Sequence, residues 1–293
     1  MTAKVRDLSY QPGLLQLKCL FRYCQARLRY EEFQQMRQLI AALPLEALLQ
    51  LQPRFAYKYL GYYTAVSFPR RARLAAILHH YRFLAAVVRQ DFFSVVAEQP
   101  VIWQDLVATE EFSIRLSYPL LGWYEGELSL HFFCNATLLQ MITFVIVPGT
   151  LIGAAAPHTL LVGQVQGTKD RQALQQATKS LHDITPATLL IQAAYGLAMA
   201  LRITHAAGVS SQEQLRYGGP TCYFNYDAFW QQFRAERLNN RLYLLDIHAP
   251  DKPLGEIKAK YRPRTLRKRA YKQQLRAAIA QHCQVAFLAP SPA

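Results

Sequence analysis

The stretch LSLHFFCNATLLQMITFVIVPGTLIGAAAPHTLLVGQVQGT, residues 128–168, decides the fold of this chain, because its 41 residues contain no Asp, Glu, Lys or Arg. Such a run is either the core of a sheet or a membrane span. A membrane-spanning helix needs about 20 apolar residues without a break. Here Pro148, Gly149, Gly153 and Pro157 divide the run into pieces of strand length. The pattern therefore predicts buried strands and disfavours the alternative of a membrane span.

Four segments in and around this run have the composition of β-strands. Residues 112–119 (FSIRLSYP) and 126–133 (GELSLHFF) alternate polar and apolar side chains, as strands with one buried face do. Residues 138–148 (LLQMITFVIVP) and 158–167 (HTLLVGQVQG) are rich in β-branched side chains and are bounded by proline and glycine. Together the four segments predict an antiparallel meander.

The chain after the meander predicts alternating helices and strands. One helix begins at Pro186, since proline is favoured at the first helical position and Thr185 before it is a good N-cap. In chain order, the expected segments are a helix at 174–181, this helix, a strand at 204–209, a helix at 226–233, a strand at 241–247 and a basic helix after Pro263.

The N-terminal third has a different pattern. Apolar residues recur at helical spacing over residues 14–107, with breaks at Pro44, Pro53, Pro69 and Pro100, so we expect several helices. The fold class that follows is α+β: a helical N-terminal region packed on a mostly antiparallel mixed sheet, with a basic C-terminal helix. The expected division is a helical region at 1–108, an α+β core at 109–256, and a basic helix and tail at 257–293.

Positive charge is concentrated at the two flanks of the chain. Residues 1–99 hold 14 Lys/Arg against 6 Asp/Glu (+8), residues 100–257 hold 10 against 13 (−3), and residues 258–293 hold 9 against none (+9). Seven of the last nine charges fall within fifteen residues, where they repel one another unless an anionic partner is near. The residues expected to contact such a surface are Arg262, Arg264, Arg267, Lys268, Arg269 and Lys272.

The expected partner is an anionic membrane surface or an acidic protein. Each basic residue near an anionic leaflet contributes about 1 kcal/mol, whereas no nucleic-acid-binding module or aromatic stacking platform is visible, so nucleic acid is disfavoured. Five cysteines without a CxxC pair or zinc spacing favour a reduced compartment and no metal. Without a signal-peptide pattern, we expect a cytoplasmic protein, with peripheral contact to the inner membrane as an open alternative.

Several segments of the chain carry a resemblance to a known family. They are EGELSL (125–130), VGQVQG (162–167), TKSLHDITP (178–186), NYDAFW (225–230), the stretch with Lys260, Arg262, Arg269 and Tyr271, and YLGYYTAVSFPRRARLAAILHHY (59–81). These segments resemble the VirK/YbjX family of proteobacterial proteins, a domain of unknown function. Where family members often show Asn and His after the strand that follows the long helix, this chain has SSQE at 210–213. The resemblance implies a link to bacterial envelope properties and virulence, and no settled reaction.

The order of segments also looks like that of a GNAT-type N-acyltransferase, which implies a GNAT-like sheet and acyl-CoA or an acyl carrier protein as donor. In such a fold the N-terminal end of the helix binds the donor's phosphates. The usual glycine-rich QxxGxG-type loop is replaced here by HDITPATL (182–189), in which Asp183 adds negative charge. The expected cofactor contacts are Gln164, Gln166, Gly167, Lys179, His182, Thr185, Ala187 and Thr188. The alternative for the two glutamines is a hydrogen bond at the strand end, and the alternative for His182 is a local hydrogen bond.

Two glutamates are the best candidates for acid–base catalysis. Glu125 and Glu127 lie two residues apart on a predicted strand, so we expect both to face the same side. The alternative is that both face water or pair with an arginine. Tyr226 and Ser210 are candidates for protonating a thiolate leaving group, with simple packing as the alternative for Tyr226.

Two functions remain open. One is acyl transfer from a thioester donor to an amine or hydroxyl at the inner face of the membrane. The other is a non-enzymatic envelope factor that binds anionic lipid or a partner protein. They differ in whether the sheet leaves a cleft beside Thr185 that reaches Glu125 or Glu127, because side chains that fill this space would count against an enzyme. No GxSxG, Walker or HExxH motif supports a hydrolase or nucleotide triphosphatase.

Overall fold

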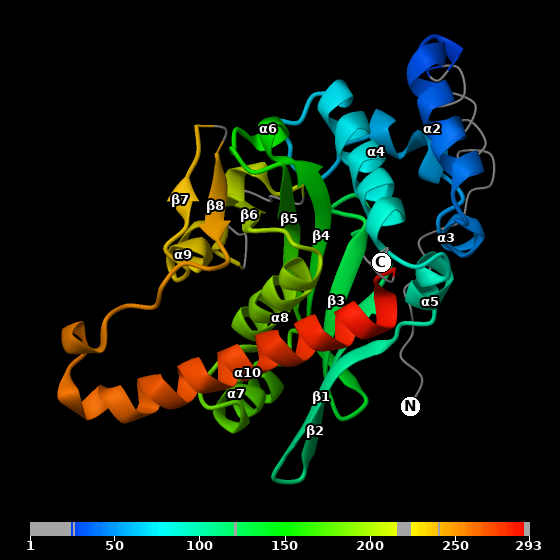
Figure 1. The fold of residues 1–293 in the computed structure, drawn as a ribbon. Helices are drawn as coiled ribbons and strands as arrows, with labels where there is room; N and C mark the ends of the chain where they lie inside the picture. The colour runs from blue at the N-terminus through cyan, green and yellow to red at the C-terminus, as the bar shows by residue number, and fades with distance from the viewer. Residues whose placement is uncertain (1–24, 26, 120–121, 216–223, 240, 290–293) are drawn as a thin grey trace.

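A computed structural model of the chain describes residues 25, 27–119, 122–215, 224–239 and 241–289 (Figure 1). The helical pattern expected before residue 25 lies outside these residues. Helices of the N-terminal region lie beside one sheet, and a long C-terminal helix crosses in front of it (Figure 1). The architecture is therefore mixed α/β, with one sheet as its centre.

Within the described residues, the sheet has eight strands in the order β1-β2-β3-β4-β5-β6-β8-β7. β5 and β6 pair in parallel, and every other neighbouring pair is antiparallel. The parallel pair follows from the helix that connects its two strands, since parallel strands need a crossover connection. The strands are β1 (Val101–Val107), β2 (Glu110–Ser117), β3 (Leu128–Cys134), β4 (Thr137–Pro148), β5 (His158–Gly167), β6 (His205–Val209), β7 (Glu236–Arg237) and β8 (Leu242–Asp246).

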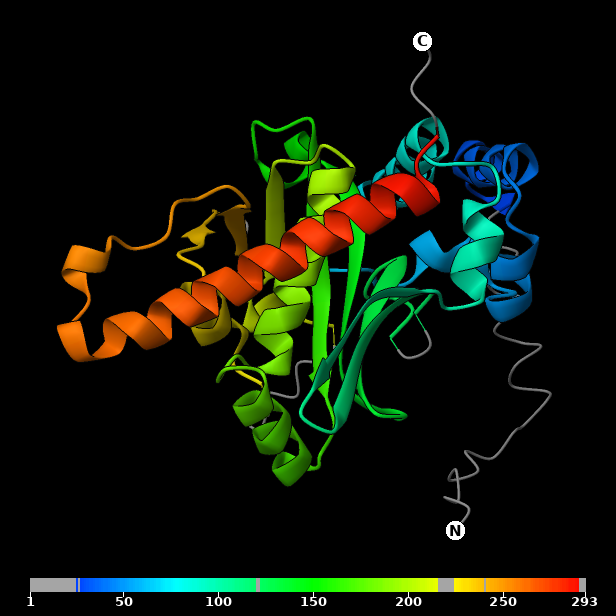
Figure 2. The same ribbon diagram turned by 60° about the horizontal axis from the view of Figure 1, so that its bottom comes forward.

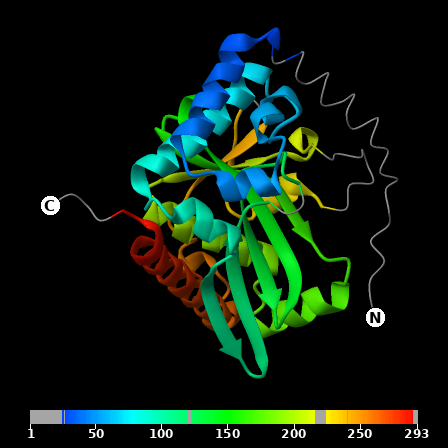
Figure 3. The ribbon, with the colours of Figure 1, turned by 90° about the vertical axis from the view of Figure 1, so that its right-hand side faces the viewer.

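The helices fall into an N-terminal group, short connections, and two long helices in the second half. The N-terminal group lies at one end of the sheet, and the β1–β2 hairpin extends away from it (Figure 3). Its members are α2 (Tyr30–Ala42), α3 (Glu46–Leu51), η1 (Phe55–Leu60), α4 (Arg70–Val87) and α5 (Phe92–Ala97). The others are α6 (Gly149–Ile152), α7 (Arg171–Ser180), α8 (Pro186–Ala200), η2 (Ser211–Glu213), α9 (Tyr226–Gln231), η4 (Leu254–Glu256), η5 (Ala259–Tyr261) and α10 (Arg262–Phe287).

The predicted fold class is confirmed, as are the four strands of the meander, which are β2 to β5. The uncharged run is the core of a sheet, and the alternative of a membrane span is wrong. Among the helices of the described ranges, none is both long enough and apolar enough to cross a membrane. One boundary was also wrong: the helical pattern was expected to run to residue 107, but Val101–Val107 is the edge strand β1. The expected division into three regions stays a prediction.

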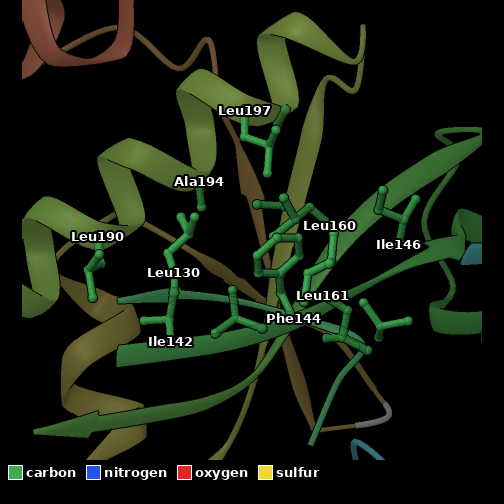
Figure 4. Close-up of a cluster of buried hydrophobic side chains, with 14 of the residues drawn as sticks. Leu130, Ile142, Phe144, Ile146, Leu160, Leu161, Leu190, Ala194 and Leu197 are labelled. Carbon is green, nitrogen blue, oxygen red and sulfur yellow. The ribbon is translucent and has the colours of Figure 1, made fainter. Parts of the chain in front are cut away.

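One face of the sheet packs against α8. Leu190, Ala194 and Leu197 point from the helix toward the strands (Figure 4). The strand residues that receive them, which we call the helix-covered face, are Leu130, Ile142, Phe144 and Leu160, and each is 0% exposed. Completely burying one such side chain contributes roughly 1.5–3 kcal/mol, so this face supplies much of the core.

The start of α8 follows the predicted chemistry. Pro186 is at the first helical turn, and the Thr185 hydroxyl accepts a hydrogen bond from the Thr188 N–H at 3.2 Å. Such a cap satisfies one of the backbone donors left free at a helix N-terminus. The predicted N-cap and first helical residue are therefore confirmed.

α10 lies across α8 and has two different halves (Figure 2). Its C-terminal half buries Leu275, Ile279, Cys283 and Phe287, whereas residues 262–270 include no buried side chain. Close approach of the two helices depends on Gly196, since a Cβ there would lie 2.7 Å from the Arg276 carbonyl oxygen. The basic N-terminal half extends past the sheet (Figures 1 and 2).

Candidate functional site

The two candidate glutamates lie in a loop and not on a strand, because β3 begins only at Leu128. Gly126 between them packs its Cα against β4, where a Cβ would meet the Phe144 carbonyl oxygen at 2.5 Å. The expectation that both carboxylates face one side of a strand was therefore wrong. Each glutamate has its own surroundings.

Glu127 is enclosed in a polar cluster in the interior. Its carboxylate lies 2.8 Å from the Lys58 ammonium, and both side chains are 0% exposed. The hydroxyls of Tyr63 and Tyr81 each donate to it at 2.7 Å, and Lys58 also donates to the Gly126 carbonyl at 2.9 Å. A buried ion pair with its hydrogen bonds satisfied is a structural element, and this carboxylate is closed to a substrate.

Burial controls the proton positions in this cluster. It raises the pKa of Tyr63 and of Tyr81 well above the usual value, and the adjacent Glu127 carboxylate raises both further. It lowers the pKa of Lys58, against the pull of Glu127. Both phenols therefore stay protonated at neutral pH and donate to Glu127.

Glu125 lies at the wall of a pocket. Its side chain is 1% exposed, and its Oε1 accepts a hydrogen bond from Gln214 Nε2 at 2.8 Å. The open pocket beside it measures about 470 Å³, and its other walls are Gly61, Tyr62, Gly122, Trp123, Tyr124 and Leu215. A carboxylate among aromatic walls in a concave site is the usual form of a binding or catalytic pocket.

Two glycines make room for Glu125. Gly122 has a φ of +74°, and a Cβ there would lie 2.0 Å from Glu125 Oε2 and 2.7 Å from Gln164 Oε1. A Cβ on Gly163 of β5 would lie 2.1 Å from the Glu125 carbonyl oxygen. Both positions thus require glycine, because the loop carrying Glu125 lies directly against β5.

A chain of hydrogen bonds continues from the pocket across the sheet. Gln164, next to Gly122, accepts from the Thr143 hydroxyl at 3.2 Å and donates to Gln166 Oε1 at 2.9 Å. Thr143 in turn shares a 2.8 Å hydrogen bond with Ser129. The two glutamines therefore face the same side, opposite the helix-covered face, and Gln164 is the one that lies beside Glu125.

The parallel strands separate next to this site. β5 pairs with β6 only from Thr159 to Val162. Beyond that point, the Tyr226 hydroxyl accepts from the Val165 N–H at 3.0 Å and donates to the Val165 carbonyl at 3.3 Å. Trp230 covers the end of β6, where its indole N–H donates to the Val209 carbonyl at 2.8 Å.

The gap between the strands is therefore filled by side chains on its α9 side, and this part of the expected cleft counts against an enzyme. The Tyr226 hydroxyl occupies the Val165 backbone groups that an extended ligand along β5 would use. Ser210 follows β6 and is 1% exposed, and within the described part of the chain its hydroxyl has no hydrogen-bond partner. The opening that reaches Glu125 is the pocket of Tyr62 and Trp123.

The residues expected to hold a cofactor fall into two groups. Gln164, Gln166 and Gly167 belong to β5; Gln164 lies beside Glu125, and Gln166 is hydrogen-bonded to Gln164. Lys179, His182, Thr185, Ala187 and Thr188 instead surround the start of α8. There the ring of His182 lies 5.0 Å from the ring of Tyr271 of α10.

Asp183, expected to repel phosphate at this helix end, is itself paired. Its carboxylate lies 2.7 Å from the Arg264 guanidinium, and its carbonyl accepts from Lys268 at 2.8 Å. Arg269 similarly pairs with Asp251 at 3.4 Å. Part of the negative charge that the basic run needs therefore comes from the chain itself, because folding brings acids from distant parts of the chain to α10.

Sequence reasoning missed several residues that shape the site. Lys58, Tyr63, Tyr81 and Gln214 build the two carboxylate environments. A signal for Lys58 was present, since it is the one charge in the apolar segment FAYKYLGYY (55–63) and apolar surroundings usually mean that such a charge is paired.

Residues 15–281 match a family described as "Protein of unknown function (DUF535)". The chain belongs to this family. One relative is the uncharacterized protein YbjX of Escherichia coli strain K12, 27% identical over 231 residues, which are 74% of this chain and 68% of the relative. An uncharacterized protein of Haemophilus influenzae is 26% identical over 266 residues, 86% of each chain. These matches confirm the resemblance to the VirK/YbjX family.

Among solved structures, the chain is similar to a cAMP-binding acyltransferase from Mycobacterium smegmatis, determined in two mutant forms. The TM-scores are 0.31 and 0.30 at 12% identity. The similarity covers 72% of this chain and 61% of each of those chains. A likeness at this level does not decide activity or ligand.

Proposed function

We propose that this DUF535 member is an acyltransferase that moves an acyl group from a thioester donor to an amine, with Glu125 as the general base. The observation that carries this proposal is the position of Glu125, a buried carboxylate on the wall of an open 470 Å³ pocket beside the point where β5 and β6 separate. Glu127 is unsuited to the role because Lys58, Tyr63 and Tyr81 enclose it.

The reaction balances with residues of the chain alone. Glu125 takes a proton from the acceptor ammonium, and the freed amine attacks the thioester carbonyl. The C–N bond forms, the C–S bond breaks, and the thiolate leaves with the electron pair of the C–S bond. The nitrogen gives its second proton to this thiolate, so that a neutral amide and a thiol are released.

The position of Tyr226 constrains where a donor binds. Because its hydroxyl occupies the Val165 backbone groups, the proposal places the thioester in the pocket of Tyr62 and Trp123 and not along β5. The donor's phosphates would then lie outside the pocket. Coenzyme A and an acyl carrier protein remain the candidate donors. Ser210, which lies beyond β6, remains a candidate proton donor to the thiolate.

A thermal-shift screen with coenzyme A, acyl-CoA species and acyl carrier protein tests donor binding. A donor at a hundred times its Kd stabilises the protein by about 2.7 kcal/mol. In a second assay, thiol release from the stabilising donor is followed with a panel of amines. Glu125→Gln should keep donor binding and lose turnover by at least about a hundredfold, whereas Glu111→Gln, an exposed carboxylate, should change neither. No stabilisation by any donor, or full turnover in Glu125→Gln, would show the proposal to be wrong.

A second candidate function rests on the exposed half of α10. Lys258 and Arg267 have no acidic partner among the residues with described structure, and Tyr261 and Leu266 beside them are 47% and 48% exposed. Exposed basic and apolar side chains together suit the surface of an anionic bilayer. Such a contact would hold the protein at the inner membrane, in line with the envelope link that the family resemblance implies. An acidic protein is the other candidate partner of this surface.

Sedimentation with vesicles tests this second function. The triple variant Lys258→Gln, Lys260→Gln, Arg267→Gln should lose roughly 3 kcal/mol of binding to vesicles with anionic lipid, at about 1 kcal/mol per charge. A control with the same net charge changes the exposed Arg27, Arg37 and Arg82 to Gln and should bind like the parent. Equal binding of the parent to neutral and anionic vesicles, or an equal loss of binding in both triple variants, would show that α10 makes no electrostatic contact with the membrane.

A further inference from the structure

The face of the sheet opposite α8 carries a row of side chains that the acyl-transfer proposal does not use. Arg115 of β2 is directly opposite His131 of β3, which is opposite Met141 of β4, which is opposite Gln166 of β5. Directly opposite residues on neighbouring strands lie on the same face, with Cβ atoms roughly 4.5–5.5 Å apart. The row therefore crosses four strands on one face of the sheet.

His131 is buried and unsatisfied. It is 0% exposed, and within the described residues neither ring nitrogen has a hydrogen-bond partner. The centroid of the His131 ring lies 6.5 Å from the centroid of the Phe133 ring. Burial lowers the pKa of His131 to about 4, so the ring is neutral at pH 7 and offers one N–H donor. Buried polar groups are nearly always hydrogen-bonded, and an exception requires an explanation.

Arg115 next to it is also incompletely satisfied. Its guanidinium lies over the Phe133 ring, 4.9 Å from the centroid. Its Nε is buried and has no hydrogen-bond partner in the described part of the chain. The row contains no carboxylate, and within the described residues this partly buried arginine forms no ion pair. Buried charges are normally paired.

The remaining polar member of the row, Gln166, lies two strands from His131, with Met141 between them. Its carboxamide oxygen accepts from Gln164 at 2.9 Å. Arg115 and His131, which are directly opposite each other, thus offer N–H groups and one positive charge. A cation or a metal ion would be repelled by this pair, whereas an oxygen anion would accept hydrogen bonds from it.

We propose that Arg115 and His131, directly opposite each other on β2 and β3, form a binding site for the oxyanion of a small ligand, either a carboxylate or a phosphate group. Arginine suits this role because its planar fork of N–H donors matches both groups. The site is separate from the Glu125 pocket, and it stands or fails independently of acyl transfer.

Histidine ring resonances of the ¹⁵N-labelled full chain test the site. Acetate and inorganic phosphate are titrated separately at constant ionic strength, and acetamide serves as the uncharged counterpart of acetate. The His131 resonance, identified by its loss in His131→Phe, should shift saturably with acetate, phosphate or both, and the response separates a carboxylate ligand from a phosphate ligand. The buried His80, which already accepts from the Ile146 N–H at 3.1 Å, should not respond.

Arg115→Met should weaken this titration by about tenfold or more, and tenfold corresponds to about 1.4 kcal/mol. The matched control is Arg202→Met, which removes an exposed arginine after α8 and should leave the titration unchanged. The unshifted His80 resonance in each variant shows that the fold is intact. No response of His131 to either anion, an equal response to acetamide, or an unchanged titration in Arg115→Met would overturn the site.

Discussion

The two faces of the sheet are buried to a similar degree but hold very different side chains. The helix-covered face consists of Leu130, Ile142, Phe144 and Leu160 and packs against α8 (Figure 4). The residues that alternate with it on the same strands, which we call the polar face, are Ser129, His131, Thr143 and Gln164, each 0–2% exposed. Packing alone explains the first face. The second needs hydrogen-bond partners for every group, and His131 has none among the described residues, which makes it the face where a ligand is expected.

The largest effect on stability is expected from the buried ion pair between Lys58 of η1 and Glu127, which lies in the same loop as Glu125. Lys58→Met leaves the Glu127 carboxylate buried without its cation, and removing one partner of such a pair costs about 3–5 kcal/mol. Urea unfolding should therefore show a much lower midpoint at an unchanged slope.

The matched control is Lys169→Met, an exposed lysine for which a change within about 0.5 kcal/mol is expected. The double variant Lys58→Met, Glu127→Leu should recover part of the loss, because no uncompensated charge remains. A loss below about 1 kcal/mol in Lys58→Met would mean that water reaches Glu127 and that the cluster is not closed.

The next effect concerns His131 and acid. Its pKa is about 4 in the folded chain and about 6.5 when exposed, so the unfolded state binds the proton more strongly between these values. This contribution to stability is complete above pH 6.5 and is lost as the pH falls toward 4. At about 1.4 kcal/mol per pKa unit, the loss is about 3 kcal/mol.

His131→Leu should remove this acid dependence and leave a flatter stability curve between pH 6.5 and 4, measured by urea unfolding at each pH. The control is His248→Leu, since His248 is exposed in a turn and should leave the curve unchanged. An identical acid dependence in the parent and in His131→Leu would place the titrating group elsewhere.

The fold was largely predictable from the sequence because local signals agreed with it. Pro148 and Gly149 end β4, Asp and Thr N-caps begin α7 and α8, and the alternation of polar and apolar residues marks β2 and β3. The strand β1 was missed because its residues VIWQDLV follow a helical pattern and Pro100 without a change of composition. Its strand identity comes from pairing with β2, which a single segment does not reveal.

A smaller effect compares two adjacent residues of β4. Thr143→Val keeps the volume but removes the hydroxyl that connects Ser129 to Gln164, so about 1–3 kcal/mol should be lost as these buried groups lose a partner. Ile142→Val, on the helix-covered face, should cost only about 0.5–1.5 kcal/mol. Urea unfolding of both variants gives the comparison, and an equal or larger loss in Ile142→Val would mean that the polar network adds little.

The candidate site was less predictable than the fold. The sequence singled out Glu125 and Gln164, but it could not separate Glu125 from Glu127, because their partners Gln214 and Lys58 lie far away in the chain. Tyr226 was a plausible acid by type, yet its hydroxyl binds the Val165 backbone, a contact set by where β6 ends. Distances across the chain, and not residue types, decided both cases.

The smallest effect on stability is expected for an ion pair at the surface. Its value is the reference against which the contribution of the polar face is compared. Arg264→Gln removes the ion pair with Asp183, in which the two side chains are 58% and 43% exposed. Exposed pairs contribute only about 0.2–1 kcal/mol, and salt screens them, so the change in unfolding free energy should be near 0.5 kcal/mol and should vanish in high salt. Asp183→Asn is the matched variant and should give the same small loss. An equal loss of unfolding free energy in Arg264→Gln and Thr143→Val would contradict this expectation. It would mean that polar contacts hold α10 to the start of α8 as strongly as they hold the strands of the sheet together. The exposed basic half of α10 would then be a rigid part of the fold, unable to adjust to a membrane or a partner.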